Sequence, residues 1–274
     1  MKIRVSFSGY LNSAPLGWSF LHGPLRERFE VIESSPARCA DYLARGQVDI
    51  ALIPSIEYQR IPDLQVVPGI AVAACGPVRS VLFVGHRERE IRTVALDTNS
   101  RTSVVLLKLW LRSVLNLAPE FVPHGPDLPR MLERCDAALL IGDSALCLPK
   151  GRYEVVDMAE AWVQWQAKPF VFALWACRAG VADTDGLVSV FQEARVWGLG
   201  MRSQIAGDYS RRLSLPAADL EDYLFRNVDY DLSDRHLEGL REFYRLADDG
   251  GLVSARQPLR FAAGSGGNTA APRA

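Results

Sequence analysis

Apolar residues form two recurring patterns along the chain, short continuous runs and longer runs with a helical period. The runs DIALI (residues 49–53) and DAALLI (136–141) are apolar without alternation, which is typical of strands buried on both faces of a parallel-rich sheet. Residues 36–45 carry a helical pattern that Gly46 ends. Over residues 102–117 apolar side chains cover most of a helix and leave one narrow polar stripe, Lys108, Arg112 and Asn116. The sequence therefore predicts an α/β protein whose helix over 102–117 is largely buried.

Two parts of the chain repeat one plan. KIRVSFSGYLNSAPLGWSFL near the N-terminus and EIRTVALDTNSRTSVVLLKL further on each contain a short strand, a polar loop and a helix start, and Ile91 follows Ile3 by 88 positions. VDIALIPSIEY and CDAALLIGDSAL also match, with Asp136 following Asp49 by 87 positions. Two matches at nearly one offset indicate two lobes built alike.

Two β-rich stretches are long enough to pass between the lobes, residues 66–86 and residues 169–180. We therefore expect a discontinuous first lobe of residues 1–84 and 178–263, and a second lobe of residues 85–177. This assignment makes the last part of the chain return to the first lobe.

After the second crossing the chain shows helical patterns only, over residues 187–206, 217–226 and 233–247. The tail GSGGNTAAPRA (264–274) is small and polar, and we expect it to be disordered.

Composition and charge narrow the functional class. The chain has 274 residues, 49% of them hydrophobic, and a formal net charge of -1, so no basic stripe indicates nucleic acid. No apolar run approaches the ~20 residues of a membrane span. The N-terminus reads as a strand rather than a signal peptide, so we expect a cytoplasmic protein. The five cysteines and four histidines are scattered without metal-ligand spacing, and we expect no metal site.

Polar loops follow the predicted strands at positions where α/β sheets bind ligands, the carboxyl ends. In the loop before the helix over 102–117, Ser100 or Thr102 is expected to cap the helix. A second hypothesis adds Arg101, Ser103 and the helix dipole, which together make a carboxylate or phosphate site. The matching loop of the first lobe offers Asn12, whose amide both donates and accepts.

Further candidates lie at the other strand ends and in a crossing strand. Ser55 follows one strand end, and Gly142 and Asp143 follow the matching one. Asp143 is the only carboxylate that we place at a strand end of the second lobe, although capping the following helix is its simplest role. Ser80 lies in a crossing strand, where a serine is usually a tolerated small residue.

Taken together, YLNSAPL, VDIALIPSIEY, GPVRSVLF, LDTNSRTSVVLLKLWL, DAALLIGDSAL and EAWVQWQAKPFVFALW resemble the chorismate dehydratases of the futalosine route to menaquinone. The resemblance extends from the N-terminus to about Trp175. It implies a two-lobed type II periplasmic-binding-protein-like fold with a central cleft between the lobes. It also implies a lyase that dehydrates chorismate to 3-[(1-carboxyvinyl)oxy]benzoate without a cofactor.

The resemblance lets us assign roles for a substrate with two carboxylates. Ser100, Arg101, Thr102 and Ser103 are expected to hold one carboxylate, and Asn12, Ser80 and Ser55 the other carboxylate or the ring hydroxyl. Gly142 is expected to be one of the residues that bind the substrate. Two alternatives stay open for the base that removes the ring proton. One is Asp143, and the other is the enolpyruvyl carboxylate of the substrate itself.

Two other functions compete with this one. The first is 1,4-dihydroxy-6-naphthoate synthase of the same pathway, which would be expected to use a protein base that the matched loops lack. The second is a non-catalytic solute-binding protein, for which the fold alone is sufficient. The expected partner is a small molecule, with no nucleic acid or membrane, and both a monomer and a homodimer stay open.

Overall fold

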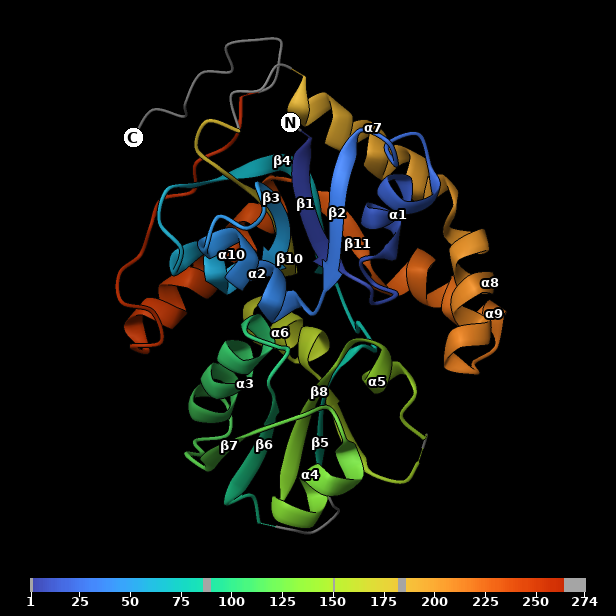
Figure 1. Cartoon of the computed structure of the whole chain (residues 1–274). Helices are drawn as coiled ribbons and strands as arrows, with labels where there is room; N and C mark the ends of the chain where they lie inside the picture. The colour runs from blue at the N-terminus through green and yellow to red at the C-terminus, as the bar shows by residue number, and fades with distance from the viewer. Residues whose placement is uncertain (1, 86–89, 150, 182–185, 264–274) are drawn as a thin grey trace.

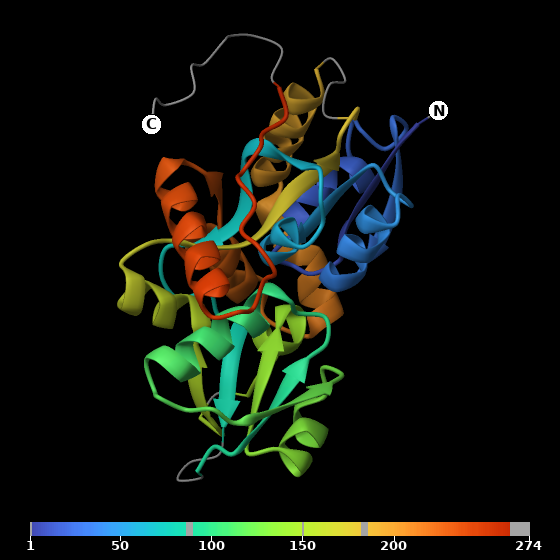
Figure 2. The same cartoon turned by 90° about the vertical axis from the view of Figure 1, so that its left-hand side faces the viewer.

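The computed structural model describes residues 2–85, 90–149, 151–181 and 186–263, and it contains two β-sheets in separate lobes (Figures 1 and 2). The first sheet has the strand order β11-β4-β10-β3-β1-β2. Its strands are β1 (Ile3–Ser8), β2 (Phe29–Ser34), β3 (Ile50–Pro54), β4 (Leu64–Ala74), β10 (Phe170–Arg178) and β11 (Asp229–Leu232). The helical elements that accompany it are α1 (Ala14–His22), α2 (Pro36–Ala44), the 3₁₀ helix η1 (Ser55–Gln59), α7 (Leu187–Gly200), α8 (Arg202–Leu213), α9 (Ala217–Asp222), the π-helix η2 (Tyr223–Asn227) and α10 (Asp234–Asp249).

The second sheet has the strand order β7-β6-β8-β5-β9. Its strands are β5 (Val81–Gly85), β6 (Thr93–Asp97), β7 (Glu120–His124), β8 (Ala137–Ile141) and β9 (Glu154–Asp157). Its helices are α3 (Thr102–Ser113), α4 (Leu128–Arg134), α5 (Gly142–Leu146) and α6 (Met158–Gln166). None of the helices in the described ranges is long and apolar enough to cross a membrane.

The predicted internal repeat is confirmed by the pairing of the strands. β1 pairs in parallel with β2 and β3, and β6 pairs in parallel with β7 and β8. An antiparallel strand then follows in each sheet, β10 beside β3 and β5 beside β8. The predicted α/β class and the two-lobed arrangement are both present.

The predicted lobe boundaries are wrong at both crossings. β5 pairs with β8 in the second sheet, although the boundary after residue 84 gave it to the first lobe. β10 pairs with β3 and β4 in the first sheet, although the boundary after residue 177 gave it to the second. The chain crosses at residues 75–80 and again near α6. Because β5 and β10 are both apolar and mostly buried, their composition does not reveal which sheet they join.

The C-terminal part differs from the predicted run of helices in three ways. The helix over 187–206 is two helices, α7 and α8, which meet at Met201. The helix over 217–226 is α9 followed by the π-helix η2. β11 is an edge strand that the sequence did not reveal, because its four residues lie between two helical patterns. The tail 264–274 lies outside the described residues.

One apolar core continues from lobe to lobe. Strand residues of β3 alternate between faces, with Ile53 toward α2 and α10 and Leu52 toward α1, α7 and α8. The core on the α10 side also contains Leu106 of α3 and Trp162 of α6, which belong to the second lobe's part of the chain. This explains why α3 is buried: it packs against its own sheet and against the first lobe together.

The contact between α1 and α7 generates a test of the packing. A Cβ atom on Gly198 of α7 would overlap the backbone carbonyl of Pro15, at the start of α1. We expect Gly198→Ala to lower the free energy of unfolding by about 1–3 kcal/mol, because backbone must move. Gly207→Ala is the matched control, since nothing lies within 4 Å of a Cβ there. It is expected to stabilise α8 by about 0.5–1 kcal/mol. Urea denaturation measures both variants, and equal effects would contradict the packing argument.

Candidate active site

A cavity lies between the lobes, at the carboxyl ends of strands from both sheets. The space between its lining atoms is about 530 Å³, including the part that is open to solvent. Ser8, Tyr10, Asn12 and Ser13 line it from the first lobe. Residues 99–103 and 141–142 line it from the second lobe. The predicted cleft is therefore present where the polar loops were expected to meet.

The wall of the cavity combines apolar surface with neutral polar groups. Leu52, Val72, Val81 and Phe172 supply apolar side chains. Among the lining residues that the structure describes there is no Asp, Glu, His, Cys or Lys, and the titratable groups are those of Tyr10 and Arg101. The cavity thus suits a ligand with an apolar ring and negative charges.

The N-terminus of α3 opens on this cavity. Ser100, Thr102 and Ser103 line it and are almost fully buried. The predicted cap is not formed: Arg101 is the N-cap residue, and no side chain accepts from the first N–H groups of the helix. The Thr102 hydroxyl instead accepts from the Ile56 amide of the first lobe at 3.2 Å. The positive end of the α3 dipole therefore faces the cavity without a side-chain partner.

A second helix N-terminus opens on the same cavity. α1 also lacks a side-chain cap, and its N-cap residue Ser13 and the preceding Asn12 line the wall. The Ser13 hydroxyl lies 2.6 Å from that of Ser8 and donates to backbone carbonyls, so it is held in place. The first amides of α1 are used within the protein, since Ala14 donates to the Tyr10 carbonyl at 3.0 Å and Pro15 has no N–H. This end therefore offers a second anionic group the α1 dipole and the side chains of Asn12 and Ser13.

Arg101 lines the cavity, but its guanidinium is not available as an unpaired cation. One nitrogen donates to Glu57 and another to Asp41 of α2, each at 2.8 Å. Arg60 donates to the other oxygen of Glu57 at 2.7 Å. These contacts pair Arg101 with two carboxylates of the first lobe, and its predicted direct contact with an anion stays a prediction.

Gly142 has the conformation and the surroundings that require glycine. Its φ of 63° lies in the left-handed region, and a Cβ there would lie 2.7 Å from the ring of Tyr10. The Gly142 amide donates to the carbonyl of Ser80 at 2.7 Å. Tyr10, which sequence reasoning missed, therefore reaches across from the first lobe and packs on the second.

Asp143 lies next to the lining residue Gly142 but is not itself part of the cavity wall. Its carboxylate accepts from the Leu11 amide of the first lobe at 2.9 Å, so it does not cap its own helix. Burial raises the pKa of this carboxyl group, against the opposite effect of the Leu11 amide. Asp143 thus links the lobes, and its predicted catalytic contact with a ligand is not made from this position.

Asp97 is a carboxylate that sequence reasoning missed. It ends β6, is fully buried, and accepts from the Asn99 amide at 2.9 Å, while its other oxygen has no hydrogen-bond partner. Burial raises its pKa. The statement that Asp143 was the only carboxylate at a strand end of the second lobe is therefore wrong. The signal was present, since Asp97 directly follows the apolar run TVAL.

Two predicted site residues do not line the cavity. Ser55 is fully buried, and its hydroxyl donates to the Val171 carbonyl at 2.7 Å. Ser80 is also fully buried, and its hydroxyl accepts from Tyr223 at 2.8 Å. Both hydroxyls are used within the protein, so direct contacts with a substrate are not supported.

Comparisons with known proteins bear on the family and the fold of the chain. A family model described as menaquinone biosynthesis matches residues 3–249. Chorismate dehydratase from Thermus thermophilus is 35% identical over 254 residues, covering 85% of this chain and 91% of that protein. A solved structure from Archaeoglobus fulgidus has a TM-score of 0.77 at 18% identity, covering 92% of this chain and 98% of that one. The alkanesulfonate-binding protein SsuA from Xanthomonas axonopodis pv. citri has a TM-score of 0.67 at 15% identity, covering 93% and 94%.

The solved structures show the fold alone, since their sequences are distant from this one. They place the chain among two-lobed proteins of the type II periplasmic-binding-protein-like fold. The family model shows the family as well as the fold, because it matches nearly the whole chain. The protein is therefore a member of the menaquinone-biosynthesis family.

Proposed function

We propose that the protein is a lyase that dehydrates chorismate to 3-[(1-carboxyvinyl)oxy]benzoate. The observation that carries this proposal is the cavity onto which two uncapped helix N-termini open and whose described wall has no carboxylate. Chorismate has a ring and two carboxylates, which match the apolar wall and the two helix ends. The Thermus thermophilus relative bears the name of this activity.

The reaction needs a proton removed and hydroxide expelled from neighbouring ring carbons. Loss of the proton beside the ether oxygen places negative charge on the ring carboxylate through the conjugated double bond. Donors fixed around that carboxylate stabilise the charge as it develops. The neighbouring C–O bond then breaks, the proton and the hydroxide leave as water, and the ring becomes aromatic. The α3 N-terminus, with Ser100 and Ser103, is the site that we assign to the ring carboxylate.

The base that we assign is the enolpyruvyl carboxylate of the substrate. Asp97 and Asp143 are buried and do not line the cavity, and the described wall offers no other carboxylate or imidazole. An enolpyruvyl arm held by Asn12 and the α1 N-terminus brings its own carboxylate to the ring proton. Fixing this arm also favours loss of water over loss of enolpyruvate.

The competing solute-binding function shares the fold, and turnover separates the two. We expect chorismate incubated with the protein to lose one water and keep its enolpyruvyl group, as followed by HPLC with mass spectrometry. Ser103→Ala should lower kcat/KM roughly 10- to 100-fold, because a hydrogen bond to a charged group is worth about 1.5–3 kcal/mol. Ser113→Ala, at the exposed end of the same helix, is the control. Chorismate recovered unchanged from folded protein would refute the proposal.

A substrate base also makes Asp143 dispensable for proton abstraction. We expect Asp143→Asn to keep most of kcat, since the amide oxygen can still accept from Leu11. Loss of a general base would instead cost about 10²–10⁴-fold. Such a loss in a folded variant would return the role to Asp143.

Stability against pH supplies a second measurement on the same variant. Burial raises the folded-state pKa of Asp143, so its ionisation costs stability as the pH rises above the unfolded value, about 3.9. Asparagine has no such cost. The Asp143→Asn variant should therefore gain stability relative to the wild type as the pH rises from 4 toward 7, which urea denaturation across pH measures; a constant difference would contradict the shift.

Arg101 is assigned as a positioning residue that holds the lobes together. A double-mutant cycle with Arg101→Met and Glu57→Gln should give a coupling of about 0.5–3 kcal/mol in the free energy of unfolding. The Arg92–Glu90 pair, which is exposed on both sides, is the control and should show much weaker coupling. Equal coupling in the two pairs would contradict the assignment.

A further inference from the structure

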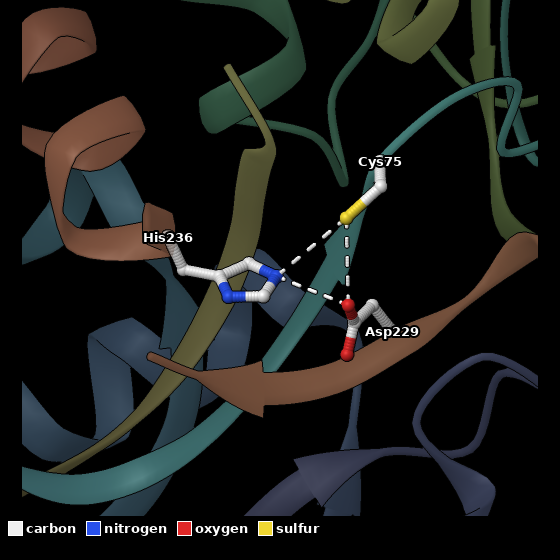
Figure 3. A group of neighbouring side chains, drawn as sticks. All are labelled: Cys75, Asp229 and His236. Atoms are coloured by element: carbon white, nitrogen blue, oxygen red, sulfur yellow. Dashed lines mark hydrogen bonds and ion pairs between the residues drawn. The ribbon is translucent and has the colours of Figure 1, made fainter. Parts of the chain in front are cut away.

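Three side chains with metal-binding atoms meet away from the chorismate cavity. Cys75 directly follows β4, Asp229 begins β11, and His236 lies in the first turn of α10 (Figure 3). None of the three lines the cavity. The sequence did not reveal this cluster, because 154 positions separate Cys75 from Asp229 and only the folded sheet brings them together.

The distances among the three atoms fit one face of a tetrahedron around a metal ion. The Cys75 sulfur lies 3.9 Å from Nε2 of His236 and 3.5 Å from Oδ2 of Asp229, and Nε2 lies 3.1 Å from Oδ2. Zinc bonds of about 2.3 Å to sulfur and about 2.0–2.2 Å to nitrogen and oxygen give tetrahedral edges of roughly 3.4–3.6 Å. Shifts of a few tenths of an ångström would complete the geometry.

The orientation of the imidazole favours a metal site over a nucleophilic cysteine. In a catalytic triad the nucleophile and the orienting carboxylate use opposite ring nitrogens. Here the thiol and the carboxylate both face Nε2, as Figure 3 shows. The other nitrogen, Nδ1, lies 2.9 Å from the Ser233 hydroxyl. The Ser233 amide also donates to Nδ1 at 3.4 Å, so two contacts fix the orientation of the ring. Zinc at Nε2 requires the ring proton to lie on Nδ1, where the Ser233 hydroxyl can accept it.

The charges in and around the cluster favour zinc. A thiolate, a carboxylate and a neutral imidazole balance one Zn²⁺, so the nearby Arg235 and Arg195 do not oppose the complex. A mixed sulfur, nitrogen and oxygen set is typical of zinc, while magnesium and calcium prefer oxygen alone. Cys75 is exposed, which leaves a fourth position for water.

We propose that Cys75, Asp229 and His236 bind one Zn²⁺. The ion would fix Cys75, the first residue of the crossing segment 75–80, to the edge strand β11 and to the start of α10. This joins the segment that leads to the second lobe with the C-terminal part of the first. The proposal is independent of the proposed dehydratase activity.

The test uses the full chain without an affinity tag, stripped with a chelator and dialysed. Zn²⁺ is titrated in competition with a chromophoric chelator. We expect one equivalent to bind to the wild type and to Cys147→Ser, which alters the other exposed cysteine. Cys75→Ser and His236→Gln should bind at least about 100-fold more weakly, since loss of even an outer partner costs about 10- to 100-fold. Circular dichroism checks that each variant is folded.

A spectroscopic measurement on the wild type needs no variant. One equivalent of Co²⁺ should give the intense visible bands of a tetrahedral site together with a thiolate-to-cobalt charge-transfer band. Absence of the thiolate band would overturn the proposal. So would one-equivalent zinc binding that persists unchanged in folded Cys75→Ser, or binding of less than one equivalent by the wild type.

Discussion

The geometry of the site depends on a buried carboxylate that pairs with an arginine of each lobe. Glu57 is 4% exposed, and a charge at such a depth needs partners. Arg60, three residues on, supplies one, and Arg101 of the second lobe supplies the other. Because Arg101 also pairs with Asp41, the N-terminus of α3 is held between two elements of the first lobe. The relative position of the lobes, and with it the shape of the cavity, follows from this pairing.

Other contacts across the boundary act in the same direction. The Leu11 amide donates to Asp143, the Ile56 amide donates to Thr102, and Tyr10 packs on Gly142. Side chains of the polar loops are thus used largely to hold the lobes together, while the first backbone N–H groups of α3 have no side-chain partner and remain directed at the cavity. This division explains why a site for anions has a neutral wall. An unpaired arginine would attract many anions, whereas two helix ends at a fixed separation select one spacing of charges.

The sequence predicted the fold well where local pattern and repetition agree. The strands around residues 49–53 and 136–141, the buried helix beginning at Thr102 and the meeting of four loops all appear in the structure. It failed where the answer depends on pairing across long distances. The sheet membership of β5 and β10 and the existence of β11 are decided by neighbours that no local pattern specifies. For the same reason the sequence could not predict the hydrogen bonds that Ser55, Ser80 and Arg101 make within the protein.

The two buried carboxylates behind Tyr10 bear on how the site tolerates a doubly charged substrate. Burial, and after it the charges of Asp97 and Asp143, raises the pKa of Tyr10 well above the ordinary value, so this hydroxyl keeps its proton and can donate. Burial raises the pKa of both carboxyl groups as well. A water-exposed aspartate on the wall would repel the substrate at every pH at which chorismate is a dianion. Asp143, buried next to Gly142, can link the lobes through the Leu11 amide without that penalty. The same placement removes them from reach of the ring proton, and this leaves the base to the substrate.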